Sequence, residues 1–501
     1  MTHLSFKPRG EKVALSFDYV VVGSGAGGAA AAVTLARAGA TVAVIEAGPW
    51  RDPSDYPHST YGAMRDMMDD WGSTVTMGKA LWPVVQARVV GGTTTINSAI
   101  CVRTPGDIFR IWEEQHGVGG DELAASVWRH QDRIEDDLSV SEVPEASLGR
   151  SNQLALAADR ALGYGGHVMR RYVKDCLGSG QCLQGCTKGR KQSTNLNYIP
   201  EVMARGGTVL SCAPAEKILF EGKRAIGVRG AFRHPQTRAK GGTFEVRATK
   251  AVLVAASVTH SPLLLMRSGV KSPALGKYFR SHPGTGVFGV YDDPVDSNTG
   301  ATQGWASTKY RVEPGLKLET LSLPMEMVAS RWSGGGHTLM ERLREFRHSA
   351  MWIHAIRAET TGTVSPGIGG RPMVRYTLDR ADMIRFRAGM RLVADMHVAA
   401  GAKAIIPGIH GMPFKLAPNE VKLLDDAPLD PKCYVAVLSH LFGGCVMGDD
   451  PKTSVCDGRG RVHGYEGLLV VDGAAIPTNL GVNPQHTIMG LAATFAEQLV
   501  A

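Results

Sequence analysis

The 501-residue sequence has no long apolar segment that would cross a membrane or direct secretion. Residues 1–17 contain several charged side chains but no apolar core of signal-peptide length. No uninterrupted apolar run elsewhere is long enough to span a bilayer. We therefore expect no transmembrane segment, and a cytoplasmic location is the default expectation.

Cysteine is also scarce, with eight residues at irregular spacing. Small secreted domains that depend on disulfides carry a higher density of cysteines, usually in a regular pattern. The eight cysteines therefore predict no disulfide framework.

Internal repeats, low-complexity tracts and a mixed basic and aromatic surface pattern are missing as well. The formal net charge is +8, and short basic clusters such as residues 188–191 have no regular aromatic partners. We expect no nucleic-acid partner, because solubility and attraction to acidic surfaces explain this modest excess better. The hydrophobic content of 44% and charged content of 20% are those of a globular protein with roughly two to four domain-sized units.

Glycine, in contrast, is abundant at 60 residues, and the most informative glycines follow a predicted strand. Residues 19–22 are a β-rich run, residues 29–38 predict a helix of small residues, and residues 41–45 predict the next strand. Strand, helix and strand within about thirty residues are typical of a βαβ unit with parallel strands.

The turn between this strand and helix reads G-S-G-A-G-G. Gly23 permits the tight turn, Gly25 allows the backbone to approach a pyrophosphate, and Gly28 allows helix and strand to pack closely. Glu46 ends the next strand, where an acidic side chain can accept hydrogen bonds from a ribose. A glycine-rich turn without a ligand is the weaker alternative, so the unit predicts a bound dinucleotide but does not separate FAD from NAD.

Two further strands lie far away in the sequence. Residues 251–256 are followed by a predicted helix that begins near residue 261, with a proline in its first turn. Residues 467–471 lead into an Asp-Gly pair, as ligand-facing strand ends do in open α/β sheets. Between about residues 285 and 430, strand-like stretches such as 287–291 and 373–377 alternate with Gly/Pro turns, which predicts an inserted antiparallel sheet.

Several segments resemble the glucose–methanol–choline (GMC) oxidoreductases. Residues 88–97 (RVVGGTTTIN) resemble the flavin-contacting GGSSxxN stretch of that family, with Thr in place of Ser. Residues 257–269 (SVTHSPLLLMRSG) are similar to its second signature, although Ser-Val replaces the leading Gly-Ala. The Ser-His-Pro at residues 281–283 is similar to the HP segment of the family near its domain crossover.

The C-terminal part carries the most specific resemblance. Residues 440–448 (HLFGGCVMG) and 471–490 (VDGAAIPTNLGVNPQHTIMG) are similar to the cholesterol-oxidase branch in particular. The middle insert carries no motif of the family, although that insert normally shapes the substrate pocket. The resemblance therefore implies the chemistry better than the substrate.

The resemblance implies an α/β fold, α+β overall, in which a Rossmann-like FAD-binding domain is assembled from discontinuous segments and joined to an antiparallel-sheet substrate domain. The expected division is FAD-binding residues 1–110, 205–285 and 431–501, a connecting or lid region with a cysteine cluster at 111–204, and a substrate-binding domain at 286–430.

The resemblance also implies which residues bind FAD. The ADP half would be held by Gly23, Ser24, Gly25, Ala26, Gly28 and Glu46, the adenine by backbone near Ala215, the isoalloxazine by Gly92, Thr93 and Asn97, the pyrophosphate and ribityl chain by Asp472 and Gly473, and the pyrimidine end by Pro484 and Gln485. We expect the FAD to be non-covalent, because Ile96 stands where a histidine carries the covalent bond in some relatives.

His440 and Asn483 are the implied catalytic pair. A neutral imidazole with an unperturbed pKa near 6.5 suits a base that takes a hydroxyl proton, which predicts a rate that rises through a pKa in the neutral range. Asn483 would hold the substrate oxygen. The alternatives are a hydrogen-bonded core histidine, and an asparagine that caps a helix starting at Pro484, with its positive end toward the flavin. The histidines expected to be structural are His260, His282, His463 and His486.

The implied function is oxidation of a primary or secondary alcohol to an aldehyde or ketone, by hydride transfer to flavin N5 with a histidine base. The alternatives are a non-redox FAD-containing lyase, similar to hydroxynitrile lyases, and a non-catalytic flavin-binding subunit. The electron acceptor, whether oxygen, a quinone or a carrier, stays open. So does the substrate, whether sterol, fatty alcohol, sugar, glycoside or aminoglycoside.

Cys176, Cys182 and Cys186 form the one local cluster of cysteines. A structural zinc or iron–sulfur site commonly has four ligands with C-x2-C pairs, whereas five and three residues separate these cysteines and no fourth ligand is obvious. A similar Cys-x-x-Gly-Cys occurs in the long-chain alcohol oxidases of the family. We expect a loop near the flavin or its entrance, and no metal.

Overall fold

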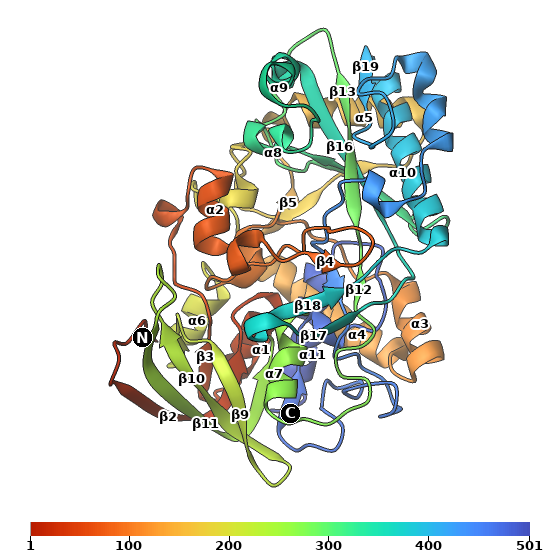
Figure 1. Cartoon of the computed structure of the whole chain (residues 1–501). Coiled ribbons are helices and arrows are strands. Elements are labelled where there is room, and N and C mark those ends of the chain that lie inside the picture. The colour runs from red at the N-terminus through yellow and green to blue at the C-terminus, as the bar shows by residue number, and fades with distance from the viewer. Residues whose placement is uncertain (1) are drawn as a thin grey trace.

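The computed structural model describes residues 2–501. The chain forms two lobes built on different sheets (Figure 1). One lobe contains both termini and an eight-stranded, mainly parallel sheet, and the other contains a six-stranded antiparallel sheet. This arrangement confirms the expected mixture of a Rossmann-like parallel sheet and an antiparallel sheet.

The eight-stranded sheet draws its strands from three distant parts of the chain. The order is β1 (Thr2–Leu4), β8 (Thr208–Leu210), β3 (Val42–Ile45), β2 (Lys12–Val22), β11 (Lys240–Val254), β10 (Arg224–Arg233) and β9 (Ala215–Glu221), and β21 (Leu468–Val470) also pairs with β11. All neighbours pair in parallel except β10 with β11 and β9. The predicted assembly from discontinuous segments is therefore confirmed.

The register of three strands brings their carboxyl ends to one edge of this sheet. Val22 of β2 pairs with Val254 of β11, which pairs in turn with Val470 of β21. These strands are almost wholly apolar near their ends because both faces of a parallel sheet are covered. The glycine turn after β2 and the Asp-Gly pair after β21 therefore lie close together.

Helix α1 (Ala26–Arg37) begins within the glycine turn and packs against α11 (Gln485–Glu497). Both helices bury nearly all of their small side chains. Alanine and glycine at the contact allow the two backbones to approach closely. The N-terminus of α11 and the end of β2 thereby reach the same region.

The antiparallel sheet forms most of the second lobe. Its strand order is β19 (Ala404–Ile406), β13 (Gly284–Val290), β16 (Ser349–Ile356), β15 (Leu316–Leu321), β14 (Trp305–Ser307) and β6 (His167–Val168). Helices α10 (Arg380–Ala399) and α5 (Arg150–Leu162) contact this sheet. The predicted strand at 373–377 lies elsewhere, because β18 (Pro372–Arg375) joins β17 (Thr363–Pro366) and β4 (Thr76–Met77) in a separate small sheet.

The remaining helices and strands lie outside the two large sheets. The helices are α2 (Thr60–Met67), α3 (Gly106–His116), α4 (Gly120–Asp137), α6 (Tyr198–Ala204), α7 (His260–Arg267), α8 (Met325–Ala329) and α9 (Gly336–Leu343). The strands are the pair β5 (Val140–Glu142) with β7 (Arg170–Tyr172) and the pair β12 (Arg280–Ser281) with β20 (Leu441–Phe442). Among residues 2–501, no helix combines the length and the apolar character that a bilayer crossing requires.

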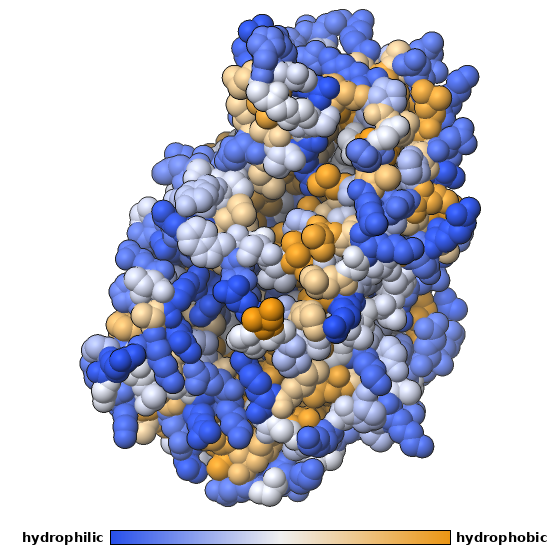
Figure 2. Space-filling model, viewed as in Figure 1, coloured by the Kyte–Doolittle hydropathy of each residue, from blue (hydrophilic) through white to orange (hydrophobic). Residues whose placement is uncertain are grey.

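Apolar residues gather in the middle of one face, over the region of β4 and β18 (Figure 2). Met77, Leu81 and Ile368 are exposed hydrophobic side chains of this part of the chain. Hydrophilic residues cover much of the remaining surface of the same face.

Candidate functional site

The glycine turn has no room for side chains at three positions. Gly23 has a φ of +106°, and a Cβ there would lie 2.1 Å from the Ala255 carbonyl oxygen. A Cβ on Gly28 would lie 2.0 Å from the Gly23 oxygen, and a Cβ on Gly27 would lie 2.0 Å from the Val471 oxygen. The requirement at Gly27, which sequence reasoning missed, arises because β21 lies beside the turn.

Glu46 connects this turn to the end of β3. Its Oε2 accepts hydrogen bonds from the backbone N (3.1 Å) and the Oγ (2.6 Å) of Ser24, and its Oε1 accepts one from Gly48 N (2.7 Å). Burial raises the pKa of Glu46, and the hydrogen bonds from Ser24 and Gly48 oppose that shift. The backbone of Ala213 donates to the Glu46 carbonyl (2.8 Å), and Ala215 follows as the first residue of β9.

A second glycine segment meets the first. Gly92 begins the short 3₁₀ helix η3 (Gly92–Thr95), and a Cβ on Gly92 would lie 2.7 Å from the Cα of Gly25. Gly91 N donates to Ser24 Oγ (2.9 Å), and Thr93 Oγ1 accepts from Ala87 N (3.3 Å). Two motifs far apart in the sequence thus present one continuous glycine-lined backbone surface, which fits the close approach of a dinucleotide.

Asn97 and Gln485 meet at the start of α11. Asn97 Nδ2 donates to Gln485 Oε1 (2.6 Å), while Asn97 Oδ1 accepts from Ala99 N (2.9 Å). The N-cap of α11 is Pro484. The structure therefore brings together the two groups expected at the flavin ring and at its pyrimidine end.

Asp472 is a second buried acidic residue, after Glu46, at this edge of the sheet. Its Oδ2 accepts from Ser261 Oγ (2.6 Å) and Ser257 N (2.8 Å), and its Oδ1 accepts from Ala474 N (2.8 Å). Burial raises the pKa of Asp472, and the hydrogen bonds from Ser261 and the two backbone groups oppose that shift. Gly473 follows in a buried 3₁₀ turn. These bonds fix the strand end after β21 against the start of α7.

His440 lies opposite His282 because β12 and β20 pair through Ser281 and Leu441. The two Nδ1 atoms are 3.1 Å apart, and the rings are stacked with centroids 5.3 Å apart. His282, expected to be structural, therefore contacts the expected base directly. The sequence shows both histidines in family motifs, one in the HP segment and one before Leu-Phe-Gly-Gly. Only the pairing of β12 with β20 shows that the two side chains meet.

Burial lowers the pKa of His440 to about 4, and the neighbouring Glu319 and Lys317 act in opposite directions. Burial likewise holds the pKa of His282 well below its ordinary value, with the His440 ring adding to the shift. Both imidazoles are therefore neutral at neutral pH. The expected pKa in the neutral range is not what the structure favours, because the ring has lost most of its contact with water.

Asn483 does not cap α11. Its side chain makes no hydrogen bond to the first turn of the helix, so the capping interpretation is wrong. Asn483 Oδ1 instead accepts a hydrogen bond from Lys317 Nζ, and Asn483 Nδ2 lies 3.3 Å from His440 Nε2. Both Asn483 and Lys317 are buried, at 5% and 1% exposure.

Sequence reasoning missed Lys317, which lies on β15 with its partner Glu319. Residues two apart on a strand point to the same face, and Lys317 Nζ donates to Glu319 Oε1. Glu319 Oε2 accepts from Gln303 Nε2 (2.9 Å). The pair occurs in a strand without a family motif, and only the fold brings it to Asn483.

These contacts assign the protons of the histidine pair. A charged lysine only donates, so the Asn483 atom that faces Lys317 is oxygen and the atom that faces His440 is nitrogen. Because an amide nitrogen also only donates, His440 Nε2 must be the acceptor, and the proton of His440 is on Nδ1. Nδ1–H then donates to His282 Nδ1. The structure thus presents an unprotonated Nε2 on His440.

A cavity of about 220 Å³ borders Lys317 on the side of the segment that follows Asn97. Its lining residues are Ile100, Cys101, Val102, Arg103, Glu142, His167, Val168, Met169, Arg170, Ala306, Thr308 and Lys317. The walls combine apolar side chains with basic ones. The cavity is large enough for a small organic molecule next to the network that orients Asn483.

The comparison with protein families decides the identity. A GMC oxidoreductase profile matches residues 17–284, and a second GMC oxidoreductase profile matches residues 360–492. The chain belongs to the GMC oxidoreductase family. FAD is the cofactor typical of this family, and the glycine-lined surface described above fits such a dinucleotide.

Relatives of this GMC oxidoreductase are similar along nearly its whole length. An uncharacterized GMC-type oxidoreductase of Mycobacterium tuberculosis is 34% identical and covers 97% of this chain and 76% of its own. A long-chain-alcohol oxidase of Arabidopsis thaliana is 24% identical and covers 96% and 67%. The crystal structure of pyridoxine 4-oxidase from Mesorbium loti has a TM-score of 0.73 at 18% identity, with 96% and 98% coverage, and shows the same fold.

The GMC oxidoreductase contains one buried group of possible metal ligands among residues 2–501. Ligand atoms of Cys101, Glu135 and His486 lie within 4.8 Å of one another. The Glu135 carboxylate already pairs with Arg103 (2.9 Å) and Arg170 (2.6 Å), and burial raises the pKa of Cys101 to about 12. Two arginines and a protonated thiol oppose cation binding.

Proposed function

We propose that this GMC oxidoreductase oxidises a primary or secondary alcohol to an aldehyde or ketone, with non-covalently bound FAD. The observation that carries the proposal is the acceptor nitrogen of His440, which a neutral imidazole presents beside the amide N–H of Asn483. An alcohol must lose a hydroxyl proton as its carbon loses a hydride, and this pair offers a base for the proton and a donor for the oxygen.

His440 Nε2 would accept the hydroxyl proton while Asn483 Nδ2 donates to the substrate oxygen. The contact between His440 Nδ1 and His282 fixes the tautomer that leaves Nε2 unprotonated, as an acceptor that faces Asn483 Nδ2. Lys317 holds the Asn483 oxygen on the side away from His440, so that the amide nitrogen faces His440. Glu319 balances the buried charge of Lys317.

FAD, when bound, supplies the acceptor for the hydride. We propose that the residues expected from the sequence hold it: Gly23, Ser24, Gly25, Ala26, Gly28 and Glu46 at the ADP half, Ala215 near the adenine, Asp472 and Gly473 at the pyrophosphate, and Gly92, Thr93, Asn97, Pro484 and Gln485 around the ring. The close approach of Gly25 to Gly92 and the bond between Asn97 and Gln485 support this set.

We also propose the expected domain boundaries, with FAD-binding residues 1–110, 205–285 and 431–501 around a substrate-binding unit at 286–430.

The named relatives act on alcohols of different size, since one is a long-chain-alcohol oxidase and one is a pyridoxine 4-oxidase. The C-terminal resemblance to the cholesterol-oxidase branch adds sterols to the classes worth testing.

The test is anaerobic bleaching of the flavin by a panel of fatty alcohols, sterols, pyridoxine-like alcohols and sugars. Bleaching by any alcohol of the panel supports oxidation, and admission of oxygen then shows whether oxygen accepts the electrons. A flavin that no alcohol bleaches, in a protein that releases cyanide from a hydroxynitrile, would contradict the proposal and favour a lyase.

A further inference from the structure

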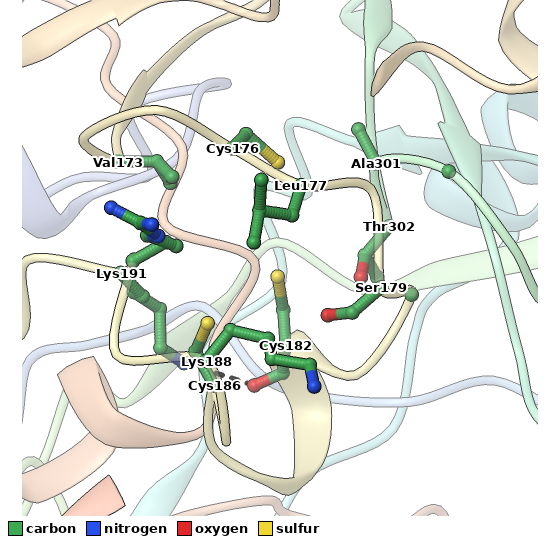
Figure 3. Close-up of a pocket in the computed structure, with 13 residues that line it drawn as sticks. Val173, Cys176, Leu177, Ser179, Cys182, Cys186, Lys188, Lys191, Ala301 and Thr302 are labelled. Atoms are coloured by element: carbon green, nitrogen blue, oxygen red, sulfur yellow. Dashed lines mark hydrogen bonds between the residues drawn. The ribbon is translucent and has the colours of Figure 1, made fainter. Parts of the chain in front are cut away.

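The cysteine cluster surrounds a small cavity beside the flavin-binding segment. Cys176, Cys182 and Cys186 lie on one loop around it, with Thr302 on the facing segment (Figure 3). The cavity measures about 10 Å³, which is room for roughly one molecule of the size of water. A reagent larger than a small inorganic molecule would not fit.

Cys182 lies against two buried cations. Arg171 Nη2 donates to Cys182 Sγ (2.9 Å), and Lys191 Nζ donates to the Cys182 carbonyl (2.9 Å). Arg171 Nε and Lys191 Nζ otherwise donate to backbone carbonyls of residues 95–98. Within the described residues, neither cation contacts a carboxylate, so a thiolate at Cys182 is the available counter-charge.

Burial opposes ionisation of Cys182, but the charges of Arg171 and Lys191 outweigh it and lower the pKa of the Cys182 thiol. Burial also lowers the pKa of Lys191 to about 8, and Cys182 counteracts that shift. Arg171 Nη1 is buried and has no hydrogen-bond partner among residues 2–501. The buried Thr302 hydroxyl has no partner in that range other than the Cys182 thiol, whose pKa it helps to lower. Thr302 lines the cavity itself.

We propose that Cys182 reacts with hydrogen peroxide, one oxygen atom of which occupies the cavity beside the sulfur. The sulfur attacks one peroxide oxygen, a sulfur–oxygen bond forms, and the oxygen–oxygen bond breaks. The sulfur is oxidised to sulfenic acid, the peroxide is reduced, and hydroxide leaves. The Thr302 hydroxyl, which lines the cavity, is placed to donate to a peroxide oxygen, while Arg171 contacts the sulfur itself. This reaction is independent of the proposed alcohol oxidation.

Treatment of the FAD-loaded protein with hydrogen peroxide, removal of the peroxide, unfolding in denaturant that contains dimedone, and peptide mass spectrometry together test the site. We expect Cys182 to carry a dimedone adduct, or a disulfide to Cys176 or Cys186, before any other cysteine reacts. Cys101 is the internal control, because it is also buried but its thiol has a pKa raised to about 12. A Cys182 that stays reduced, or that reacts no faster than Cys101, overturns the proposal.

Arg171→Met tests the role of the cation, since the thiolate fraction at fixed pH falls about tenfold for each unit by which the pKa rises. We expect slower oxidation of Cys182 by at least that factor, with Cys101 unchanged. Unchanged oxidation of Cys182 in the folded variant contradicts the assignment. If the variant does not fold, mapping of the parent protein decides alone.

Discussion

Lys317 donates a hydrogen bond to Asn483 Oδ1. That contact determines which ring nitrogen of His440 carries the proton. Lys317→Met keeps a side chain of similar length but leaves the Asn483 oxygen without its donor. We expect flavin reduction by an alcohol to slow by about 10–100-fold, the usual worth of one hydrogen bond to a charged group, because the amide can then turn its oxygen toward His440. Anaerobic stopped-flow absorbance measures this rate.

The same substitution leaves Glu319 buried and unpaired, which costs about 3–5 kcal/mol of unfolding free energy. The double variant Lys317→Met/Glu319→Gln removes that charge and is the matched control. Its melting temperature should recover toward the parent value while reduction stays slow. Recovery of the parent rate would show that Lys317 has no part in orienting Asn483.

His440→Ala should bind FAD normally and lose roughly 10²–10⁴-fold of the reduction rate, as removal of a general base does. His440→Asn should lose a similar factor, because an amide does not accept a proton at neutral pH. Since burial lowers the pKa of His440 to about 4, the base is free above that pH. The parent rate should therefore be flat across neutral pH and fall only as the pH approaches 4.

Stopped-flow reduction across pH 4–9, on variants with matched FAD content, checks both statements. A His440→Ala variant that is reduced within a few-fold of the parent rate would remove His440 from the mechanism. A parent rate that halves near pH 6.5 would show an imidazole in contact with water.

Ile96 bears on the attachment of the flavin. Its side chain is buried in an apolar cluster with Tyr56, Met67 and Val89, and it has no nucleophilic atom. We expect acid precipitation to leave the yellow colour in the supernatant. Flavin that stays with the precipitated protein would show a covalent link from another residue.

At the scale of whole elements, the contact of α1 with β21 depends on Gly27. A Cβ at this position would lie 2.0 Å from the Val471 oxygen, so Gly27→Ala must push the glycine turn away from β21. We expect a loss of FAD occupancy together with about 1–3 kcal/mol of stability. The ratio of flavin to protein absorbance measures occupancy.

Gly335→Ala is the control for Gly27→Ala, because a Cβ at Gly335 meets no atom within 4 Å and the residue has no positive φ. This variant should keep the FAD content and melting temperature of the parent. Full FAD occupancy in Gly27→Ala would mean that the turn and β21 tolerate a shift.

The sequence predicted the elements with strong patterns and missed those without them. The βαβ unit at 19–45 was predictable because buried parallel strands are continuously apolar and the turn needs glycine. Only the end of β11 was predicted, since its first part alternates exposed and buried residues in a hairpin with β10. The two-residue strand β6 was missed because so short an edge strand has no periodicity.

The residues of the candidate site show the same contrast between what sequence patterns predict and what they miss. His440 and Asn483 were named because they stand in family motifs. The contacts of His282 and Lys317 with them were not predictable, because β12 and β15 join the site only through strand pairing and lobe packing. Local sequence gives no signal for a pairing partner about 160 residues away.

At the scale of the whole molecule, we expect purified protein to contain well below one zinc or iron per chain. In the group of Cys101, Glu135 and His486, the Glu135 carboxylate already forms ion pairs with two arginines. Cys182 contacts a third arginine, Arg171. Elemental analysis after gel filtration measures the metal content, with a known zinc protein as the control. One metal per chain would overturn this prediction and reopen an electron-transfer role for the cysteines.

The position of β21 has a consequence during synthesis. β2 and β11 are synthesised before β21, which lies beside the glycine turn, and before α11, which carries Gln485 at its start. A nascent chain that has not reached residue 468 lacks β21, one wall of the dinucleotide cradle, as well as Asn483. Chains arrested before that point would therefore emerge without the yellow cofactor, exposed to proteolysis at the open edge of β11.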